Sequence, residues 1–239
     1  MTPGRPRAIV SWSSGKDSAW ALETVRRAGA FDVVGLLTTV TEGLDRVSMH
    51  GVREEILDLQ AARVGLPCVK VRIPPRCTNA DYERAMGEAL CLSRGRGVTH
   101  VVFGDLFLED VRRYREERLE GSGIEPVFPL WGRDTSELAA EMITGGLQAV
   151  VVCVDPRALP GSFAGRSFDA QFLQDLPESV DPCGEKGEFH TCVTAGPMFQ
   201  SPVFVRPGEV LEREGFLFAD LLTESGDGGA SEKRQPVSP

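Results

Sequence analysis

The sequence predicts an α/β protein built on a Rossmann-like parallel sheet, followed by a smaller α+β C-terminal subdomain. The first half alternates short apolar runs with helix-period segments, the order that places parallel strands side by side with helices on both faces. The run DVVGLLTTV over 32–40 is almost continuously apolar, as in a strand buried on both faces. The second half is less regular, although the apolar run over 147–154 predicts another buried strand.

The predicted elements of the first half are strands over 7–12, 32–40, 69–73 and 99–103 and helices over 18–28, 52–64, 80–92 and 109–119. Gly29 and Gly65 end the first two helices, because glycine readily takes the left-handed conformation that follows a helix. The second half predicts a helix over 135–144 with Thr135 as its N-cap, a strand over 147–154, a short helix over 168–176, a loop over 181–191 and weak strands over 203–205 and 215–217.

The change in regularity near 126–131 predicts a division of the chain. We expect a first domain over 1–128 and a smaller subdomain over 129–223. Residues 224–239 contain almost no apolar side chains, so we expect a disordered tail there.

Composition excludes several classes of function. The chain has 239 residues, with 26 Lys and Arg against 35 Asp and Glu, so its formal net charge is −9. This charge argues against a broad nucleic-acid surface, because no basic surplus exists to neutralise phosphates. The apolar runs are far shorter than the roughly 20 residues that a membrane helix needs, so no membrane association is expected. The six cysteines form no CxxC pair, which is typical of reduced thiols and predicts a cytoplasmic protein.

The most informative local feature is the segment VSWSSGKDS over 10–18, between the first strand and the first helix. Small residues let backbone N–H groups turn toward an anion, and the start of a helix adds a partial positive charge. Lys16 adds a full charge, and Ser13, Ser14 and Ser18 add hydroxyl donors. The segment is not a Walker A loop, because that motif needs Gly at position 10 and Ser or Thr at position 17.

The segment resembles the PP-loop, S-G-G-K-D-S, of the ATP pyrophosphatase superfamily. The match covers Ser13, Gly15, Lys16, Asp17 and Ser18, while Ser14 replaces the usual second glycine. The resemblance implies cleavage of ATP between its α- and β-phosphates, with adenylation of a substrate oxygen. It also implies that the parallel sheet is of the adenine nucleotide alpha hydrolase type.

Three further segments sharpen the resemblance: VSMHGVREEILDL over 47–59, HVVFGDL over 100–106 and VDPCGEKGEFHT over 180–191. Together with the loop, they resemble the diphthine–ammonia ligase (diphthamide synthase) family over roughly 7–220. The resemblance implies that ATP and Mg²⁺ activate a carboxylate as an acyl-adenylate, after which ammonia from ammonium displaces AMP. In organisms that make diphthamide, the implied acceptor is diphthine on elongation factor 2. The sequence leaves other carboxylate acceptors, and a homodimer, open.

The resemblance and the positions of the residues imply roles in nucleotide binding. The loop from Ser13 to Ser18 binds the departing pyrophosphate, with Lys16 as its cation. Gly104 lets the backbone approach closely, and Asp105, just past a strand, holds Mg²⁺ or the substrate amine. Asp17 reaches Mg²⁺ or orients Lys16. Thr38 and Thr39 line the adenosine pocket, or are ordinary strand residues.

The resemblance also implies an acceptor side of the site in the second half. Glu185, Glu188 and His190 are predicted to face the carboxyl edge of the sheet and to act on ammonium. His50 lies near a strand end, which favours function, whereas His100 begins a strand and is expected to be structural. The arginines at 112, 113, 115 and 118 form either a solvated helix face or a docking surface.

Two alternatives to an amide ligase remain. One is a PP-loop tRNA-modifying enzyme, which the net charge and the absence of paired cysteines disfavour. The other is a nucleotide-binding regulator without chemistry, which the retained Lys16 and Asp17 disfavour.

Overall fold

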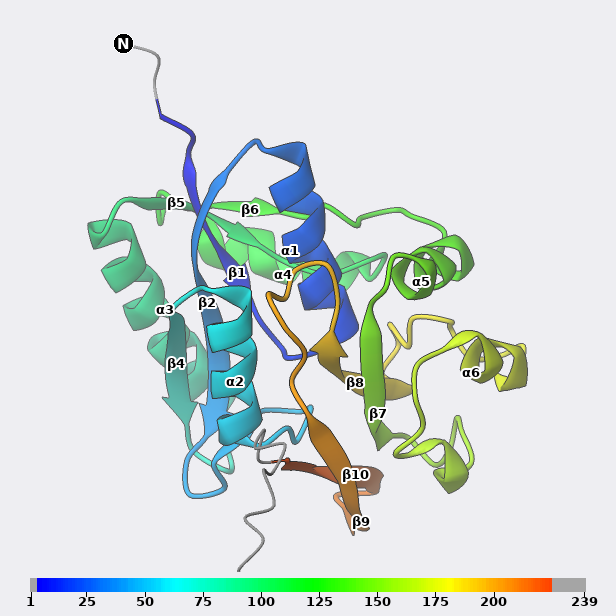
Figure 1. Cartoon of the computed structure of the whole chain (residues 1–239). Helices are drawn as coiled ribbons and strands as arrows, with labels where there is room; N and C mark the ends of the chain where they lie inside the picture. Colours follow the sequence, from blue (N-terminus) through cyan, green and yellow to red (C-terminus); the bar gives the residue numbers. More distant parts are fainter. Residues whose placement is uncertain (1–3, 225–239) are drawn as a thin grey trace, which may run out of the picture.

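The computed structural model describes residues 4–224, and the predicted tail beyond Glu224 lies outside these residues. Its larger sheet contains β1 (Arg7–Ser11), β2 (Asp32–Thr41), β3 (Arg46–Val47), β4 (Cys68–Ile73), β5 (Val98–Val102) and β6 (Glu125–Val127). The strand order is β3-β2-β1-β5-β6, with β4 paired to β2 (Figure 1). Every pairing is parallel except that of β2 with the short β3. The predicted parallel sheet is confirmed.

Helices cover both faces of this sheet: α1 (Lys16–Ala28), α2 (Glu54–Val64), α3 (Asn79–Gly95) and α4 (Glu109–Leu119). Side chains of a strand alternate between the two faces, so Val10 packs in one core with Trp20 of α1, whereas Ile9 packs in the other with Ala89 of α3 and Leu119 of α4. Burial on both faces explains the near-continuous apolar composition of β2.

The second half forms a smaller, four-stranded antiparallel sheet with the order β8-β7-β10-β9. Its elements are α5 (Thr135–Thr144), β7 (Gln148–Val154), the 3-10 turn η1 (Gly161–Phe163), α6 (Ala170–Asp175), β8 (Phe189–Ala195), β9 (Val205–Arg213) and β10 (Phe216–Thr223). One hydrophobic core joins Val10 and Trp20 of the first half to Val151 and Phe189 of the second. The α+β character is confirmed, while the division at 128/129 stays a prediction.

The second sheet corrects the sequence prediction in several places. The segment 181–191 is not entirely a loop, because β8 begins at Phe189. The weak strands over 203–205 and 215–217 reach only the first residues of a longer hairpin, β9–β10. β9 is mostly exposed and lacks an apolar pattern, whereas β10 is intermediate to buried and runs further than predicted. Thr223 ends β10. The short strands β3 and β6 were also missed, since two or three residues show no periodicity.

The start of α1 and the N-cap of α5 also differ from the prediction. α1 begins at Lys16 rather than Ser18, because Gly15 is extended and caps the helix directly after the loop. The N-cap of α5 is Asp134, whose carboxylate accepts a hydrogen bond from the Glu137 amide at 2.9 Å. Thr135 instead donates its hydroxyl to Asp181 at 2.7 Å.

An ion-pair group fastens the β9–β10 hairpin to the first half. Asp220 of β10 accepts from Arg46 at 2.9 Å and from Arg53 at 2.6 Å. Burial alone would raise the pKa of Asp220, but the two guanidinium groups outweigh it and lower the pKa to about 2. The carboxylate is therefore ionised at neutral pH and holds the hairpin in place.

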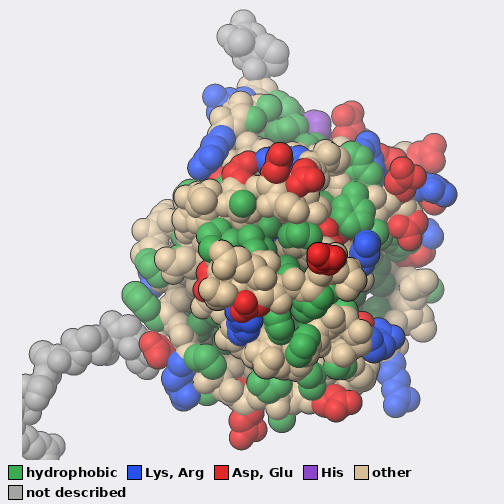
Figure 2. Space-filling model, turned by 90° about the vertical axis from the view of Figure 1, so that its right-hand side faces the viewer, with side chains coloured by type: hydrophobic (Ala, Val, Ile, Leu, Met, Phe, Trp, Pro, Cys, Tyr) green, Lys and Arg blue, Asp and Glu red, His purple; other side chains and the backbone are tan. Residues whose placement is uncertain are grey.

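Charged side chains do not gather into one patch on the face shown in Figure 2. Lysine and arginine side chains are scattered there among aspartate and glutamate side chains, with hydrophobic and other uncharged groups between them. Within residues 4–224, no helix combines the length and the apolar character that crossing a membrane requires.

Candidate active site

A cavity of about 360 Å³ opens at the carboxyl ends of β1 and β5. The order of the strands reverses at β1, because β2 lies on one side of it and β5 lies on the other. In open α/β sheets, ligands bind at such a switch point. The cavity is lined from both halves of the chain by Ser13, Lys16, Asp17, Ser18, His50, Phe103, Gly104, Asp105, Arg115, Glu185, Phe189, His190 and Thr191, among others.

The loop between β1 and α1 turns sharply at Ser14. Ser14 has φ +68°, in the left-handed region that disfavours any residue with a Cβ. Its side chain is fully buried, and its hydroxyl has no hydrogen-bond partner within the described residues. Gly15 is required by space, because a Cβ there would lie 2.9 Å from the His50 ring. Ser14 therefore shapes the loop from beneath and does not line the cavity.

The loop is hydrogen-bonded to β8 of the second half. The Val193 amide donates to the Ser14 carbonyl at 2.9 Å, and the Lys16 amide donates to the Thr191 hydroxyl at 3.1 Å. Gln60 of α2, which is fully buried, donates to the carbonyls of Ser14 at 3.2 Å and Val193 at 2.7 Å. It also accepts from the Trp12 indole at 3.0 Å. The two sheets thus meet at the loop between β1 and α1.

Lys16 is only 2% exposed and is fully paired. Its Nζ donates to both carboxylate oxygens of Asp17 at 2.9 Å and to the Cys183 carbonyl. It also lies 5.7 Å and 5.5 Å from the ring centroids of Phe168 and Phe189, within cation–π range. Burial alone would lower the pKa of Lys16, but Asp17 outweighs it and raises the pKa. Lys16 is therefore a fixed cation at the cavity wall.

Asp105 is also paired, with a residue of α4. Arg115 donates Nε and Nη2 to the two oxygens of Asp105, at 2.6 Å and 3.0 Å. The preceding Gly104 lies against the loop, since a Cβ there would sit 2.7 Å from the Asp17 carbonyl carbon and 2.8 Å from the Ser18 amide. The close backbone approach predicted for Gly104 is present, and no other residue fits at this position without displacing the loop.

Glu185 and two histidines occupy the side of the cavity that comes from the second half and from the β3–α2 turn. Burial raises the pKa of Glu185 to about 7, and the nearby charges of Asp17 and Asp105 act in the same direction. One Glu185 oxygen accepts from the Leu106 amide at 2.8 Å.

His50 and His190 are neutral at pH 7. Burial, with a smaller contribution from Lys16, lowers the pKa of His190 to about 4. Burial and the neighbouring His190 lower the pKa of His50 well below its ordinary value. Their rings pack with centroids 4.6 Å apart. At neutral pH this wall offers one carboxyl group that titrates there and two uncharged imidazoles.

Three predicted site residues lie elsewhere. Glu188 does not face the cavity: it is buried beneath the 181–188 turn, where it accepts from the Asp181 amide at 3.1 Å. Thr38 donates its hydroxyl to the Trp12 carbonyl at 2.8 Å and so joins β2 to the residue that follows β1. Thr39 is not among the residues that line this cavity. β2 ends at Thr41, one residue later than predicted, and Thr41 lines a neighbouring cavity.

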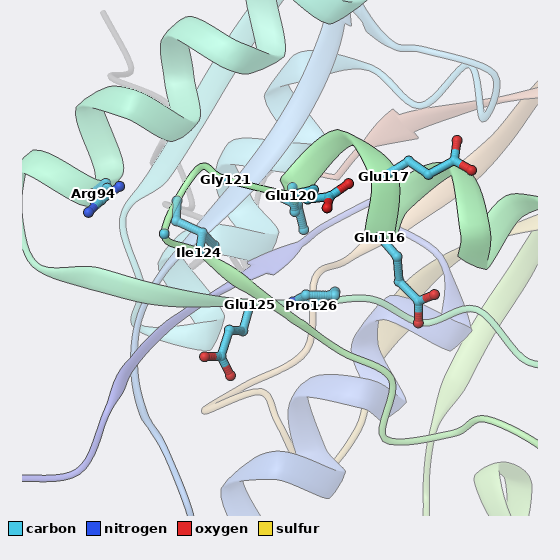
Figure 3. Close-up of a pocket in the computed structure, with 10 residues that line it drawn as sticks. Arg94, Glu116, Glu117, Glu120, Gly121, Ile124, Glu125 and Pro126 are labelled. Atoms are coloured by element: carbon cyan, nitrogen blue, oxygen red, sulfur yellow. The ribbon is translucent and has the colours of Figure 1, made fainter.

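A larger and more open hollow of about 690 Å³ lies at the amino ends of β5 and β6 (Figure 3). It is lined by Arg94 and by carboxylates of α4 and β6, including Glu117 and Glu125. This edge of the sheet is opposite the loop, and no residue predicted to act in catalysis lines the hollow. His100 also lies away from the cavity, where it packs against Phe31.

Three residues at the site were missed by sequence analysis. Thr191 and Gln60 act through hydrogen bonds to residues far away in the sequence, for which the chain offers no local signal. Arg115 belongs to the noted arginine cluster, but spacing alone does not show which arginine turns inward.

The sheet, the loop and the cavity at the strand ends define an α/β protein of the Rossmann-like class with one site built from both halves. The N-terminal domain model of diphthamide synthase matches residues 6–126, and the C-terminal domain model matches residues 134–219. The chain belongs to the diphthamide synthase family.

Curated relatives are similar along most of their length. A diphthine–ammonia ligase from Danio rerio is 28% identical over 239 residues, covering 90% of this chain and 92% of the relative. The proteins of the same name from Homo sapiens and Bos taurus are 27% and 26% identical, each covering 90% of this chain and 88% of the relative.

Replacing Ser14 by glycine should stabilise the protein. The change removes a left-handed serine, which costs about 1–2 kcal/mol, and a buried unpaired hydroxyl, which costs about 1–3 kcal/mol. The added chain entropy and the space vacated oppose this gain, so we expect a net increase of about 1 kcal/mol, or roughly 2–4 °C in Tm by calorimetry. The same change at Ser11, in β1, should destabilise. A Tm that falls in Ser14→Gly would contradict the strain assigned to this turn.

Proposed function

We propose that this protein is an ATP-dependent amide ligase, which adenylates a carboxylate and transfers ammonia to it with release of AMP and pyrophosphate. The observation that carries the proposal is the single cavity in which the loop cation Lys16, the Asp105–Arg115 pair and the carboxyl group of Glu185 converge. The family and the names of the relatives support the same reaction class.

Charge balance supports ATP bound as its magnesium complex. Each cation at the cavity is already paired with a carboxylate, Lys16 with Asp17 and Arg115 with Asp105. Such a wall has little net positive charge for a triphosphate, so an added cation is needed. Mg²⁺ usually binds one or two carboxylates together with phosphate oxygens. Asp17 and Asp105 fit that role, and residues 4–224 contain no cluster of three or more metal-ligating side chains.

Bound Mg²⁺ would neutralise charge on the phosphates. The loop and Lys16 hold the β- and γ-phosphates, and the first turn of α1 adds its partial positive charge. A carboxylate oxygen of the acceptor attacks the α-phosphorus, the bond from that phosphorus to the bridging oxygen breaks, and pyrophosphate leaves with the electron pair. The product is an acyl-adenylate.

Ammonia then attacks the acyl carbon. Ammonium first loses one proton to solvent to become ammonia. The C–N bond then forms, the C–O bond to AMP breaks, and the nitrogen loses a second proton. Glu185 is placed to accept that proton, because a carboxyl group with a pKa of about 7 is a balanced acid and base at neutral pH. His50 and His190, being neutral, add no charge that would repel ammonium.

The acceptor is a carboxylate, and ammonium supplies the nitrogen. The names of the relatives point to diphthine as the acceptor. We infer from the sequence resemblance that this diphthine lies on elongation factor 2 where the organism makes diphthamide. The apolar Phe189 and the second half close one side of the cavity, which supports shielding of the acyl-adenylate from water.

The products of ATP turnover test the reaction class. Incubation with Mg·ATP, ammonium and an acceptor should give AMP and pyrophosphate on chromatography. Lys16→Met should lower turnover by about 10²-fold or more, because it removes the loop cation. ADP and phosphate as the main products would overturn the reaction class, and ATP that binds but is never cleaved would favour a regulator.

The pH dependence of amide formation tests Glu185. In the wild type, the rate should rise through pH 7 as Glu185 loses its proton, since only the carboxylate accepts a proton from nitrogen. Glu185→Gln should lower the rate by about 10²–10⁴-fold and remove this rise, while Mg·ATP affinity stays within about twofold. The titration of ammonium itself is common to both proteins and serves as the internal control. Identical pH profiles would exclude Glu185 as the proton acceptor.

A further inference from the structure

We propose that Arg115 binds the carboxylate of the acceptor, and that Asp105 positions Arg115 rather than acting alone. The inference rests on the proposed ligase function and names the residue that selects its substrate. It starts from the arginine cluster of α4, whose members have different environments.

Only one arginine of the cluster lines the cavity. Arg112 pairs with Glu116 and stacks on the rings of Phe128 and Trp131, at 4.9 Å and 4.7 Å. Arg118 pairs with Glu83 of α3. Arg115 instead turns inward to Asp105, and its guanidinium lies 4.4 Å from the centroid of the Phe103 ring. The cluster is therefore not one continuous surface.

The guanidinium of Arg115 has an edge left for a ligand. Asp105 accepts from Nε and Nη2, so Nη1 takes no part in that pair, and the Tyr82 hydroxyl is another polar neighbour of the guanidinium. A guanidinium carries five N–H donors in a planar fork, and a second carboxylate can bind the edge formed by Nη1 and Nη2. The Phe103 ring and Asp105 fix the plane of the fork, which is the geometry that recognises a planar carboxylate.

The other cation of the cavity is committed elsewhere. The Nζ of Lys16 is bonded to Asp17 and to the Cys183 carbonyl, and Lys16 belongs to the loop that would hold the phosphates. Among the described cavity residues this leaves Arg115 as the charged donor on the side of β5.

Glu185 lies on that same side, because it accepts from the Leu106 amide and is influenced by the charge of Asp105. A carboxylate on Arg115 is thus near the group that would take the proton from ammonia. The acceptor carbon and the ammonia nitrogen would meet between these two residues.

Binding of butyrate tests the inference without knowledge of the natural acceptor. The protein is saturated with magnesium and α,β-methylene ATP, which cannot be cleaved between its α- and β-phosphates. Butyrate binding is then measured by saturation-transfer NMR, with butyramide as the neutral isostere. We expect the wild type to prefer butyrate, and Arg115→Met to weaken butyrate binding by about tenfold or more. Arg115→Lys keeps the charge without the fork and should recover only part of the binding.

Arg118→Met is the matched control, because this arginine of α4 lies outside the cavity and should bind butyrate as the wild type does. Nucleotide affinity should be unchanged in Arg118→Met and should not fall in the Arg115 variants, because Asp105 keeps its charge for the magnesium ion, and circular dichroism checks folding. If Arg115→Met does not fold, Arg115→Lys supplies the comparison. Butyrate binding that is unchanged in the folded Arg115 variants, or nucleotide affinity that falls with it, overturns the proposal. So does a wild type that binds the nucleotide but not butyrate, whereas one that fails to bind the nucleotide contradicts the ligase function itself.

Discussion

The hydrogen bonds between β8 and the loop that joins β1 to α1 are the contact on which the rest of the site depends. Ser14 and Lys16 of the loop are bonded to Val193 and Thr191, which lie some 180 residues further along the chain. Gln60 closes the arrangement by donating to both sides. Because β8 follows directly after the segment that carries Glu185, the same bonds bring the second half of the chain over the cavity.

Pairing of opposite charges is the second principle of the site. Lys16 with Asp17 and Arg115 with Asp105 leave few uncompensated charges in the cavity. Glu185 is the exception, and its raised pKa is the consequence. A nucleotide with its magnesium ion would enter a site whose donors are already oriented, which is the condition for electrostatic catalysis. The strained Ser14 beneath the loop is consistent with the strain commonly found at functional sites.

Sequence reasoning predicted the larger sheet, its helices and the loop because those features are local. An apolar run such as β2, or a glycine such as Gly29 after a helix, has a direct structural meaning. It failed for most of the β9–β10 hairpin, of which β9 is mostly exposed and shows no apolar pattern. It also failed for Glu188, because the direction of a side chain in a turn depends on the fold around it. Arg115 shows the same limit at the site: four arginines on one helix look alike until Asp105 and Phe103 are placed beside one of them.

Native-state hydrogen exchange tests the hydrogen bonding between the loop and β8 most directly. Thr191→Val removes the acceptor of the Lys16 amide while keeping the size of the side chain. The account predicts that exchange of the Lys16 and Val193 amides accelerates by about tenfold or more in this variant, while the amides of β1 keep their protection. An unchanged Lys16 amide, or a Val193 amide that stays protected while Lys16 exchanges freely, would contradict it.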